Sequence, residues 1–445
     1  MERKILILTY DFPPYISVGG LRPNAWFKYF NEFGFHPIVV TRQWDNKYGD
    51  FRDYISSSES QETLKEEFQI GTILRAPYFP NFSNKLLLRY GKEKYALMRK
   101  IYSGLTEFIQ FPLPIGPKRT LYLTAREYLL KNKVDYIVVT GDPFILFKYA
   151  SSLSKQFNIP WIADYRDPWT LNGEQNKSWL VKRYFGFFEN KYVKTASFIT
   201  TVSKFVEFKI RKTNNTNVPP VHIISNGFDD EAIDDIKNIN QNRKMLTISF
   251  VGTLYDWHPY VQFLKVCNDF FDETNERFSI KFYGTNRNND IINLVERDYK
   301  NLDGYVEVIS KIPNKTLLTE LAQDNVMLLF NYYSYMGTKI FDYIAIKRKI
   351  ILCFTEDSDA LKLKEQFYNI DENSVFSGQL QADLIKETNS GIIVKDQIEL
   401  KQILLDLIQE FKEQSYISCE TKNIDNYSRK FNVKRLADII RRNDF

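Results

Sequence analysis

The chain contains few of the residues that bind metals or form disulfides. Its 445 residues include three histidines, at positions 36, 222 and 258, and three cysteines, at positions 267, 353 and 419. These positions are far apart and match no metal-ligand spacing, and three cysteines cannot form the framework of a small disulfide-rich domain. We therefore predict a protein without a metal or a cofactor, from a reducing compartment such as the cytoplasm.

Long apolar runs are also lacking. No run approaches the roughly 18 residues of a transmembrane helix, and the early run at residues 5–8 is too short for a signal peptide. By these criteria the chain does not span a membrane, although it is still able to lie on one.

Glycine, proline and excess charge are scarce too. There are 18 glycines and 16 prolines, while 44% of the residues are hydrophobic, which excludes collagenous and disordered classes. A net charge of +5 is too small at this length to indicate binding to nucleic acid. The composition is that of a globular protein with more than one domain.

Short apolar runs alternate with longer amphipathic stretches along the chain. This alternation is typical of βαβ units, in which helices connect parallel strands. In the first half we predict strands at residues 4–9, 36–41, 73–76, 135–140, 161–165, 198–202 and 222–225. Helices are predicted between them at residues 22–33, 117–131, 144–157 and 179–194.

Residues 229–244 are polar and rich in acidic residues and asparagine, so we predict a linker there. After it, strands are predicted at residues 246–251, 279–283, 306–309, 326–330, 349–354 and 391–394. The sequence thus predicts an α/β fold of two doubly wound, Rossmann-like domains, 1–228 and 229–424, with a C-terminal helix in 425–445 that returns to the first. Because ligands bind at the carboxyl ends of such strands, we expect the domains to face one another across a cleft.

The loop after the first strand ends in two glycines at the start of a helix. Backbone N–H groups and the helix dipole favour an anion there, and Gly19 and Gly20 let it approach closely. Arg22 adds a charged donor. The alternative is a tight turn that needs glycine at positive φ. A nicotinamide site is disfavoured, because G-x-G-x-x-G is absent and Thr41 and Arg42 stand where an acidic residue is expected.

Charged residues also follow two other predicted strands. The segment Asp-Tyr-Arg-Asp-Pro-Trp contains Asp164, Arg166, Asp167 and Trp169, and Asp142 follows another strand. Carboxylates and a guanidinium at a strand end are able to bind sugar hydroxyls, and a tryptophan ring can stack on a sugar face. The structural alternatives are an ion pair between Asp164 and Arg166 and helix caps at Asp167 and Asp142.

The second half contains a further candidate site for an anion. The segment Met-Gly-Thr-Lys-Ile-Phe-Asp opens a predicted helix, and its first turn offers Gly337, Thr338 and Lys339 to an anion. Asp342, three residues after the lysine, is placed to hold vicinal hydroxyls. The alternative is an ordinary capped helix with a surface lysine. A weaker signal is Gly252-Thr253 after the strand at 246–251.

The order of these motifs resembles glycosyltransferase family 4, which has the GT-B architecture. The resemblance covers nearly the whole chain through Phe-Pro-Pro…Gly-Gly-Leu-Arg, Ala-Asp-Tyr-Arg-Asp-Pro-Trp, Ser-Asn-Gly-Phe-Asp, Phe-Val-Gly-Thr and Lys-Ile-Phe-Asp-Tyr-Ile-Ala. It implies that Gly19 and Gly20 face the diphosphate of a donor across the cleft and that residues 337–339 hold the phosphates. Asp342 then occupies the position of the family's second glutamate, which binds the ribose.

Two features depart from the family pattern. Ser334 stands where the family has its first glutamate, and the arginine and lysine usual after the first strand of the second domain are missing. Lys339, Arg287 and His258 are the candidates to replace that positive charge.

We interpret the chain as a metal-independent glycosyltransferase that acts in surface polysaccharide synthesis. It is expected to move a sugar from a UDP- or GDP-sugar to a glycan or lipid-linked acceptor, and the resemblance implies retention of configuration. The predicted catalytic residues are Arg166, Asp167 and Asp142, the acceptor side contains Asp164 and Trp169, and the donor site includes Arg22, Gly252 and Thr253. The alternatives are a GT-B sugar-nucleotide epimerase or hydrolase and a catalytically silent binding subunit.

Residues 84–108 combine basic and apolar side chains. The basic residues are Lys85, Arg89, Lys92, Lys94, Arg99 and Lys100, and leucines and other apolar residues lie between them. This pattern is typical of a helix on an anionic membrane surface. We therefore expect a cytoplasmic protein that is peripheral at the inner face of the cell membrane. The alternative is a solvated helix packed on the sheet.

Overall fold

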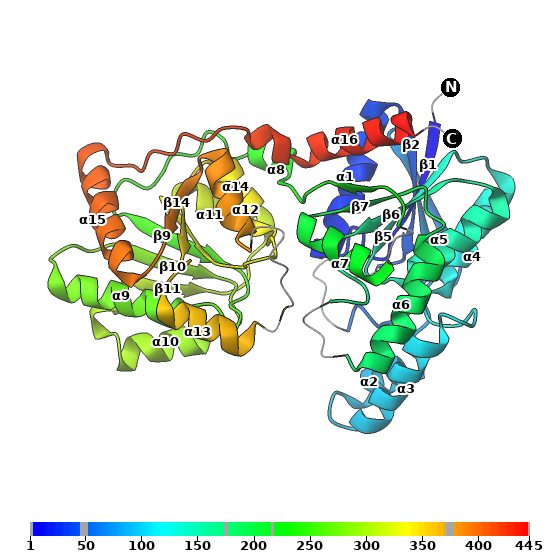
Figure 1. Ribbon diagram of the computed structural model, residues 1–445, viewed down its shortest axis with the longest axis horizontal. Coiled ribbons are helices and arrows are strands. Elements are labelled where there is room, and N and C mark those ends of the chain that lie inside the picture. The colour runs from blue at the N-terminus through cyan, green and yellow to red at the C-terminus, as the bar shows by residue number, and fades with distance from the viewer. Residues whose placement is uncertain are drawn as a thin grey trace. The chain divides into compact units, whose positions relative to one another are not determined.

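The computed structural model describes residues 3–44, 52–172, 177–214, 218–368, 370 and 378–443, and the chain forms two compact units (Figure 1). The first domain comprises residues 1–225 and 432–445, and the second comprises residues 226–431. The chain therefore leaves the first domain close to the predicted boundary at residue 228 and returns to it with its last helix.

An eight-stranded sheet lies at the centre of the first domain. The strand order is β3-β4-β2-β1-β5-β6-β7-β8, and neighbouring strands are parallel except for β3 and β4. The strands are β1 (Arg3–Leu8), β2 (Phe35–Arg42), β3 (Leu64–Phe68), β4 (Gly71–Ala76), β5 (Tyr136–Gly141), β6 (Trp161–Tyr165), β7 (Phe198–Thr201) and β8 (Val221–Ile223).

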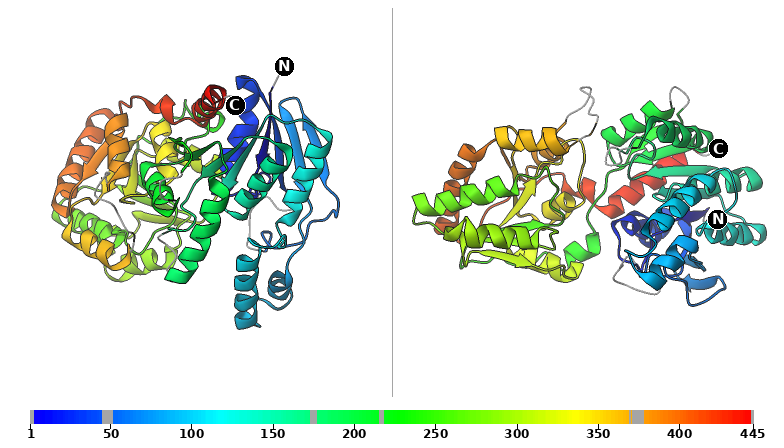
Figure 2. Two further views of the ribbon diagram at one scale, coloured as in Figure 1. Left: turned by 45° about the vertical axis from the view of Figure 1, so that its right-hand side comes forward. Right: turned by 90° about the horizontal axis from the view of Figure 1, so that it is seen from below.

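Helices cover both faces of this sheet (Figures 1 and 2). The helices of this domain are α1 (Leu21–Tyr29), α2 (Phe82–Tyr90), α3 (Ala96–Ile109), α4 (Arg119–Lys131), α5 (Ile145–Phe157), α6 (Trp179–Val193), α7 (Lys204–Asn214) and α16 (Arg429–Arg442), with short 3-10 turns η1 (Val18–Gly20) and η2 (Phe30–Phe33), and of these α2 and α3 do not pack on the sheet. On one face, Trp26 of α1 and Leu436 of α16 pack with Ile5 and Ile7 of β1. Leu6 points to the other face and is also fully buried.

The second domain has a six-stranded parallel sheet in the order β11-β10-β9-β12-β13-β14. The strands are β9 (Thr247–Val251), β10 (Ser279–Tyr283), β11 (Val306–Ile309), β12 (Val326–Phe330), β13 (Lys349–Cys353) and β14 (Gly391–Val394). The helices are α8 (Asp230–Asp234), α9 (Tyr260–Glu273), α10 (Asn288–Arg297), α11 (Asn314–Gln323), α12 (Lys339–Ile346), α13 (Ser358–Phe367), α14 (Leu380–Thr388) and α15 (Gln397–Gln414), with η3 (Lys300–Leu302) and η4 (Ile424–Tyr427).

Two separate cores hold this second sheet. Ile248 of β9 packs with Phe270 of α9 on one face, and Leu329 of β12 packs with Leu321 and Ile344 of α11 and α12 on the other. A parallel sheet covered on both faces needs strands that are apolar throughout. The alternation of such strands with helices predicted this architecture, and the α/β fold class with two parallel-sheet domains is confirmed.

Residues 229–244 are not the linker that their polarity predicted. They include α8, and Ile233, Ile236 and Ile239 pack against the core of the second domain. Arg348 also donates a hydrogen bond from Nη2 to the carbonyl of Ile239 at 2.9 Å. The isoleucines were hidden between acidic and amide residues, so composition outweighed spacing in the prediction.

Two other segments differ from the sequence prediction. β3 was missed because its Leu-Lys-Glu-Glu-Phe sequence is mostly exposed at the edge of the sheet. Residues 84–108 form two helices instead of one, since Gly91 has φ +79° and ends α2 before α3 begins. Among the described residues, no helix is both long enough and apolar enough to cross a membrane.

Candidate functional site

The first sheet reverses its strand order between β1 and β5. From these neighbours the sheet continues to β2 on one side and to β6 on the other. Loops that leave the carboxyl ends of two such strands diverge, and α/β proteins bind ligands where they do so. We call the carboxyl ends of β1, β5 and β6, with the loops that follow them, the first switch point.

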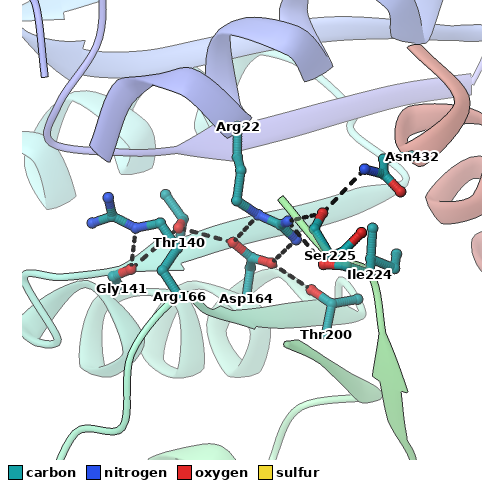
Figure 3. Close-up of polar contacts among 9 residues, drawn as sticks. All are labelled: Arg22, Thr140, Gly141, Asp164, Arg166, Thr200, Ile224, Ser225 and Asn432. Carbon is teal, nitrogen blue, oxygen red and sulfur yellow. Dashed lines mark hydrogen bonds and ion pairs between the residues drawn. The ribbon is translucent and has the colours of Figure 1, made fainter. Parts of the chain in front are cut away.

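Arg22 and Asp164 form a buried ion pair near the carboxyl ends of β5 and β6 (Figure 3). Nε and Nη2 of Arg22 donate to Oδ2 and Oδ1 of Asp164 at 3.2 and 2.7 Å. The hydroxyls of Thr140 and Thr200 donate to the same carboxylate at 2.9 and 2.8 Å. Asp164 is fully buried, so these four hydrogen bonds replace its contacts with water.

The same guanidinium also binds the backbone at residues 224–225, where the chain leaves the first domain. Nη1 of Arg22 donates to the carbonyls of Ile224 and Ser225 at 2.9 and 3.0 Å. The side-chain amide of Asn432, in α16, donates to the carbonyl of Ser225 at 3.1 Å. One ion pair therefore fixes both the point where the chain leaves this domain and the helix with which it returns.

Two of the predicted binding residues are thus bonded to each other. The sequence predicted a donor contact for Arg22 and an acceptor contact for Asp164, and in the structure both side chains are buried and paired inside the domain. The alternative ion pair between Asp164 and Arg166 is wrong, because Arg22 takes that position.

Arg166 lies at the first switch point and crosses the end of β5. Its Nε donates to the carbonyl of Gly141 at 2.8 Å (Figure 3). Its Nη2 donates to the carbonyl of Asp142 at 3.0 Å. A Cβ atom added at Gly19 would lie 2.6 Å from Nη1 of Arg166 and 2.5 Å from Oδ2 of Asp11. A side chain at position 19 would therefore have to displace the ends of the Asp11 and Arg166 side chains. Gly19 is not among the residues at positive φ, so the tight-turn alternative is wrong.

Asp11, which the sequence did not single out, belongs to the same cluster. Ser17 donates from Oγ to its Oδ2 at 2.6 Å, while Oδ1 is buried without a partner among the described residues. Burial raises the pKa of Asp11; the hydrogen bond from Ser17 and the charge of Arg166 lower it, and the charge of Asp142 raises it further. The usable signal was its position, as the first acid after the first strand of a doubly wound sheet.

Asp142 and Asp167 both reach solvent at the first switch point. The protein that surrounds Asp167 raises the pKa of its carboxyl group, Arg166 lowers this pKa, and Asp142 raises it. Neither residue caps a helix, because the N-cap of α5 is Phe144 and α6 begins only at Trp179. Two accessible carboxylates and one guanidinium thus lie together and are able to bind hydroxyl groups.

Trp169, for which we predicted stacking on a sugar, is covered by rings of its own domain. The residue is 4% exposed. Its ring stacks on Phe144, with centroids 5.2 Å apart and planes 2° apart, and Phe111 lies 5.1 Å away. Trp169 therefore anchors the loop that carries Asp167.

The second sheet reverses its order between β9 and β12. The loop after β9 begins with Gly252, at φ +107°, and Thr253, and the loop after β12 leads into α12. In the first turn of α12, Nζ of Lys339 lies 3.2 Å from Oδ2 of Asp342. A Cβ atom at Gly337 would meet nothing within 4 Å. We call these strand ends and loops the second switch point.

The start of α12 has no side-chain cap. Thr338 is the N-cap residue, and its side chain makes no capping hydrogen bond. Backbone N–H groups of a first turn that no side chain caps suit the binding of an anion.

His258 and Arg287 do not supply the positive charge expected here. His258 is 2% exposed, and burial lowers its pKa to about 3, so the ring is neutral at physiological pH. Arg287 forms ion pairs with Asp256 and Asp290. Ser334 is fully buried, so it does not present a side chain where the family has its first glutamate.

Aromatic rings occupy the second switch point instead. Tyr255 and Trp257 stack with centroids 4.5 Å apart, and Tyr332 lies edge-on to Tyr255 at 5.3 Å. Such rings are able to stack on flat ligand groups. The loop after β9 thus contributes aromatic surface in place of the basic pair.

Comparisons with known proteins identify the fold. No protein-family model matches the chain, and no curated protein matches it. Among solved structures, sucrose-phosphate synthase from Thermosynechococcus elongatus is 14% identical with a TM-score of 0.54, over 98% of this chain and 94% of that chain. An alpha,alpha-trehalose-phosphate synthase (UDP-forming) from Burkholderia xenovorans, in complex with glucose-6-phosphate, is 12% identical with a TM-score of 0.59, over 99% of each chain.

HepE from Anabaena, in complex with UDP-glucose, is 11% identical with a TM-score of 0.50, over 99% of each chain. At these identities the similarity establishes the fold alone. The chain has the GT-B fold, as the resemblance predicted, while membership of family 4 stays a prediction.

Asp164→Ala should destabilise the first domain strongly. Removing one partner of a buried ion pair leaves an uncompensated charge, which costs about 3–5 kcal/mol. Urea unfolding would measure the loss. Asp234→Ala is the control, because its ion pair with Lys237 is exposed on both sides and should contribute at most about 1 kcal/mol. Equal, small losses in both variants would contradict a central role for the Arg22–Asp164 pair.

Stability should also decrease when the pH is lowered, because His258 is buried in its neutral form. The folded protein keeps this ring neutral down to about pH 3, whereas the unfolded chain takes up a proton below its ordinary pKa of 6.5. Stability is therefore lost as the pH falls from 6.5 toward 3, by up to about 1.4 kcal/mol per pH unit. Nδ1 of His258 accepts a hydrogen bond from the backbone N–H of Tyr255 at 3.3 Å. His258→Asn keeps an acceptor there and should flatten this slope. Above pH 7 the two curves should run parallel; identical slopes below pH 6 would refute the assignment.

Proposed function

We propose that this protein is a glycosyltransferase that uses a nucleotide-activated sugar. The arrangement at the second switch point carries the proposal: an open glycine backbone precedes a helix whose first turn pairs Lys339 with Asp342 at 3.2 Å. Backbone N–H groups and a lysine suit a diphosphate, and a carboxylate one turn on suits ribose hydroxyls. The GT-B fold supports the same class of enzyme.

The proposed donor is a UDP-sugar, with a GDP-sugar as the alternative. HepE was solved with UDP-glucose, and the Burkholderia xenovorans enzyme is described as UDP-forming. Gly252, Thr253, Gly337 and Thr338 would lie along the donor. The rings of the loop after β9 add flat surface for a base or a sugar.

We propose that the first switch point binds the acceptor and supports the chemistry through Arg166, Asp167 and Asp142. The carboxylates bind acceptor hydroxyls, and the guanidinium stabilises negative charge that develops in the transition state. The acceptor oxygen forms a bond to the anomeric carbon as the bond to the diphosphate breaks. The acceptor proton passes to the leaving diphosphate on the same face, which gives retention without a metal or a protein nucleophile.

The proposed setting is the synthesis of a surface polysaccharide at the inner face of the cell membrane. A glycan or a lipid-linked glycan would be the acceptor. The support is segment 84–108 of the first domain, whose basic and apolar side chains suit contact with anionic lipid.

Lys339→Ala and Asp342→Ala should each weaken donor binding. Loss of a charge-assisted hydrogen bond costs about 1.5–3 kcal/mol, which is roughly a tenfold to hundredfold rise in Kd. Calorimetry with UDP-glucose and GDP-mannose would measure it. The matched control is Lys237→Ala, because Lys237 and Asp234 form an exposed pair with the same spacing and the same 3.2 Å separation. Unchanged affinity in all three variants would reject the donor site.

Arg166→Ala should lower turnover much more than donor affinity. Removing a donor that stabilises developing charge typically costs about 100-fold or more in kcat. Nucleotide release with a sugar acceptor would be compared with donor binding by calorimetry. Equal losses of both would favour a structural role for Arg166. Turnover of the donor without any acceptor would indicate a hydrolase or epimerase, and donor binding without turnover would indicate a silent subunit.

A further inference from the structure

Helices α2 and α3 form a hairpin that stands off the sheet of the first domain (Figures 1 and 2). The two helices are joined by a hydrogen bond from Ser103 Oγ to Ser83 Oγ at 2.8 Å and by the edge-on rings of Phe82 and Tyr102. α3 contains no buried residue over its whole length. Packing inside the domain therefore does not account for its amphipathic sequence.

The exposed side of this hairpin carries an apolar stripe. Leu97, Ile101 and Leu105 of α3 are 73%, 56% and 54% exposed. Their spacing of four residues places them on one side of the helix. Apolar side chains are more stable when they are removed from water. A row of three that stays exposed is therefore typical of a site for interaction with another molecule or a membrane.

The end of α3 contacts α6, which also has exposed apolar side chains. Phe108 of α3 packs against the ring of Tyr184, and the hydroxyl of Tyr184 donates to the carbonyl of Phe108 at 2.5 Å. Near this contact, at the beginning of α6, Trp179 and Leu180 are 66% and 69% exposed. We call the hairpin and the first two turns of α6 the docking face.

The docking face carries more positive than negative charge. Its exposed acidic residues are Glu93 and Glu107, and its exposed basic residues are Lys85, Arg89, Lys92, Lys94, Lys100, Lys182 and Arg183. Around the hairpin turn, Lys94 Nζ lies 5.0 and 5.4 Å from the ring centres of Tyr90 and Tyr95. Apolar side chains flanked by cations, with tyrosine and tryptophan between them, are typical of proteins at the bilayer interface.

We propose that the docking face binds the surface of a bilayer that contains anionic lipid. Two copies of this protein would bring their positive charges together if they met through the same face, so charge disfavours self-association. A negatively charged bilayer matches both the cations and the apolar stripe. The inference locates the membrane contact of the proposed function on named residues, and it rests on the surface of the first domain alone.

Flotation of the full chain with vesicles tests the proposal. Binding to phosphatidylcholine vesicles should require added phosphatidylglycerol and should weaken as salt is raised from about 0.15 M to about 1 M. Replacing Lys85, Lys92 and Lys94 by Gln should lower the partition coefficient on the order of 100-fold, because each charge contributes roughly fivefold. Leu97→Gln with Ile101→Gln should also reduce binding.

Matched controls come from the second domain. Replacing Lys237, Lys300 and Lys315 by Gln removes three exposed charges, and Ile398→Gln removes a side chain that is 83% exposed. Both control proteins should bind vesicles like the parent, and all variants should keep the parent's circular dichroism. Equal binding to neutral vesicles, or equal losses in the control and docking-face variants, would overturn the proposal.

Two further measurements separate the possible outcomes. A parent protein that is dimeric in light scattering, ignores vesicles and becomes monomeric on Leu97→Gln would assign the face to a second copy and overturn the proposal. Donor affinity is measured on the same proteins without vesicles. Vesicle binding without donor binding would reject the proposed function and support the docking face; donor binding without vesicle binding would do the reverse.

Discussion

The buried Arg22–Asp164 ion pair is the constraint on which the first domain depends. A carboxylate at zero exposure is tolerated only when every lost contact with water is replaced, and here α1, β5 and β7 all donate to it. The same arginine binds the carbonyl of Ser225, where Asn432 also donates. One desolvated pair thus holds the ends of three parallel strands, the exit of the chain and the return of α16 in a single arrangement.

This use of Arg22 decides what is left for chemistry. Asp164 lies within β6, near its carboxyl end, and is buried. Arg166, just beyond the end of β6, reaches across β5 and lies beside Gly19 and Asp11. Charged residues two positions apart in the sequence therefore serve the fold and the candidate site respectively. The separation follows from the strand end, because a residue inside the sheet is covered by α1 and a residue after it is not.

The sequence predicts those features that depend on neighbouring residues. Apolar runs such as Ile5–Leu8 predicted buried parallel strands. Several of the predicted site residues follow such strands and therefore lie near the two points where the strand order reverses. What the sequence does not predict depends on distant partners: Asp164 pairs with a residue 142 positions away, and Trp169 is buried by Phe111 and Phe144. A local motif shows which groups are present, but not which of them the rest of the chain will cover.

The second domain shows the same principle applied to charge. A diphosphate needs positive charge or hydrogen-bond donors, and the three cations suggested by the sequence are not equivalent in the structure. Burial leaves His258 neutral, and Arg287 forms ion pairs with two aspartates. Lys339 forms an ion pair with Asp342. Lys339 and the N–H groups of the first turn of α12 are therefore the groups at the second switch point that suit an anion. At the same strand ends, the loop after β9 contributes aromatic rings instead of charge, and such rings suit flat ligand groups.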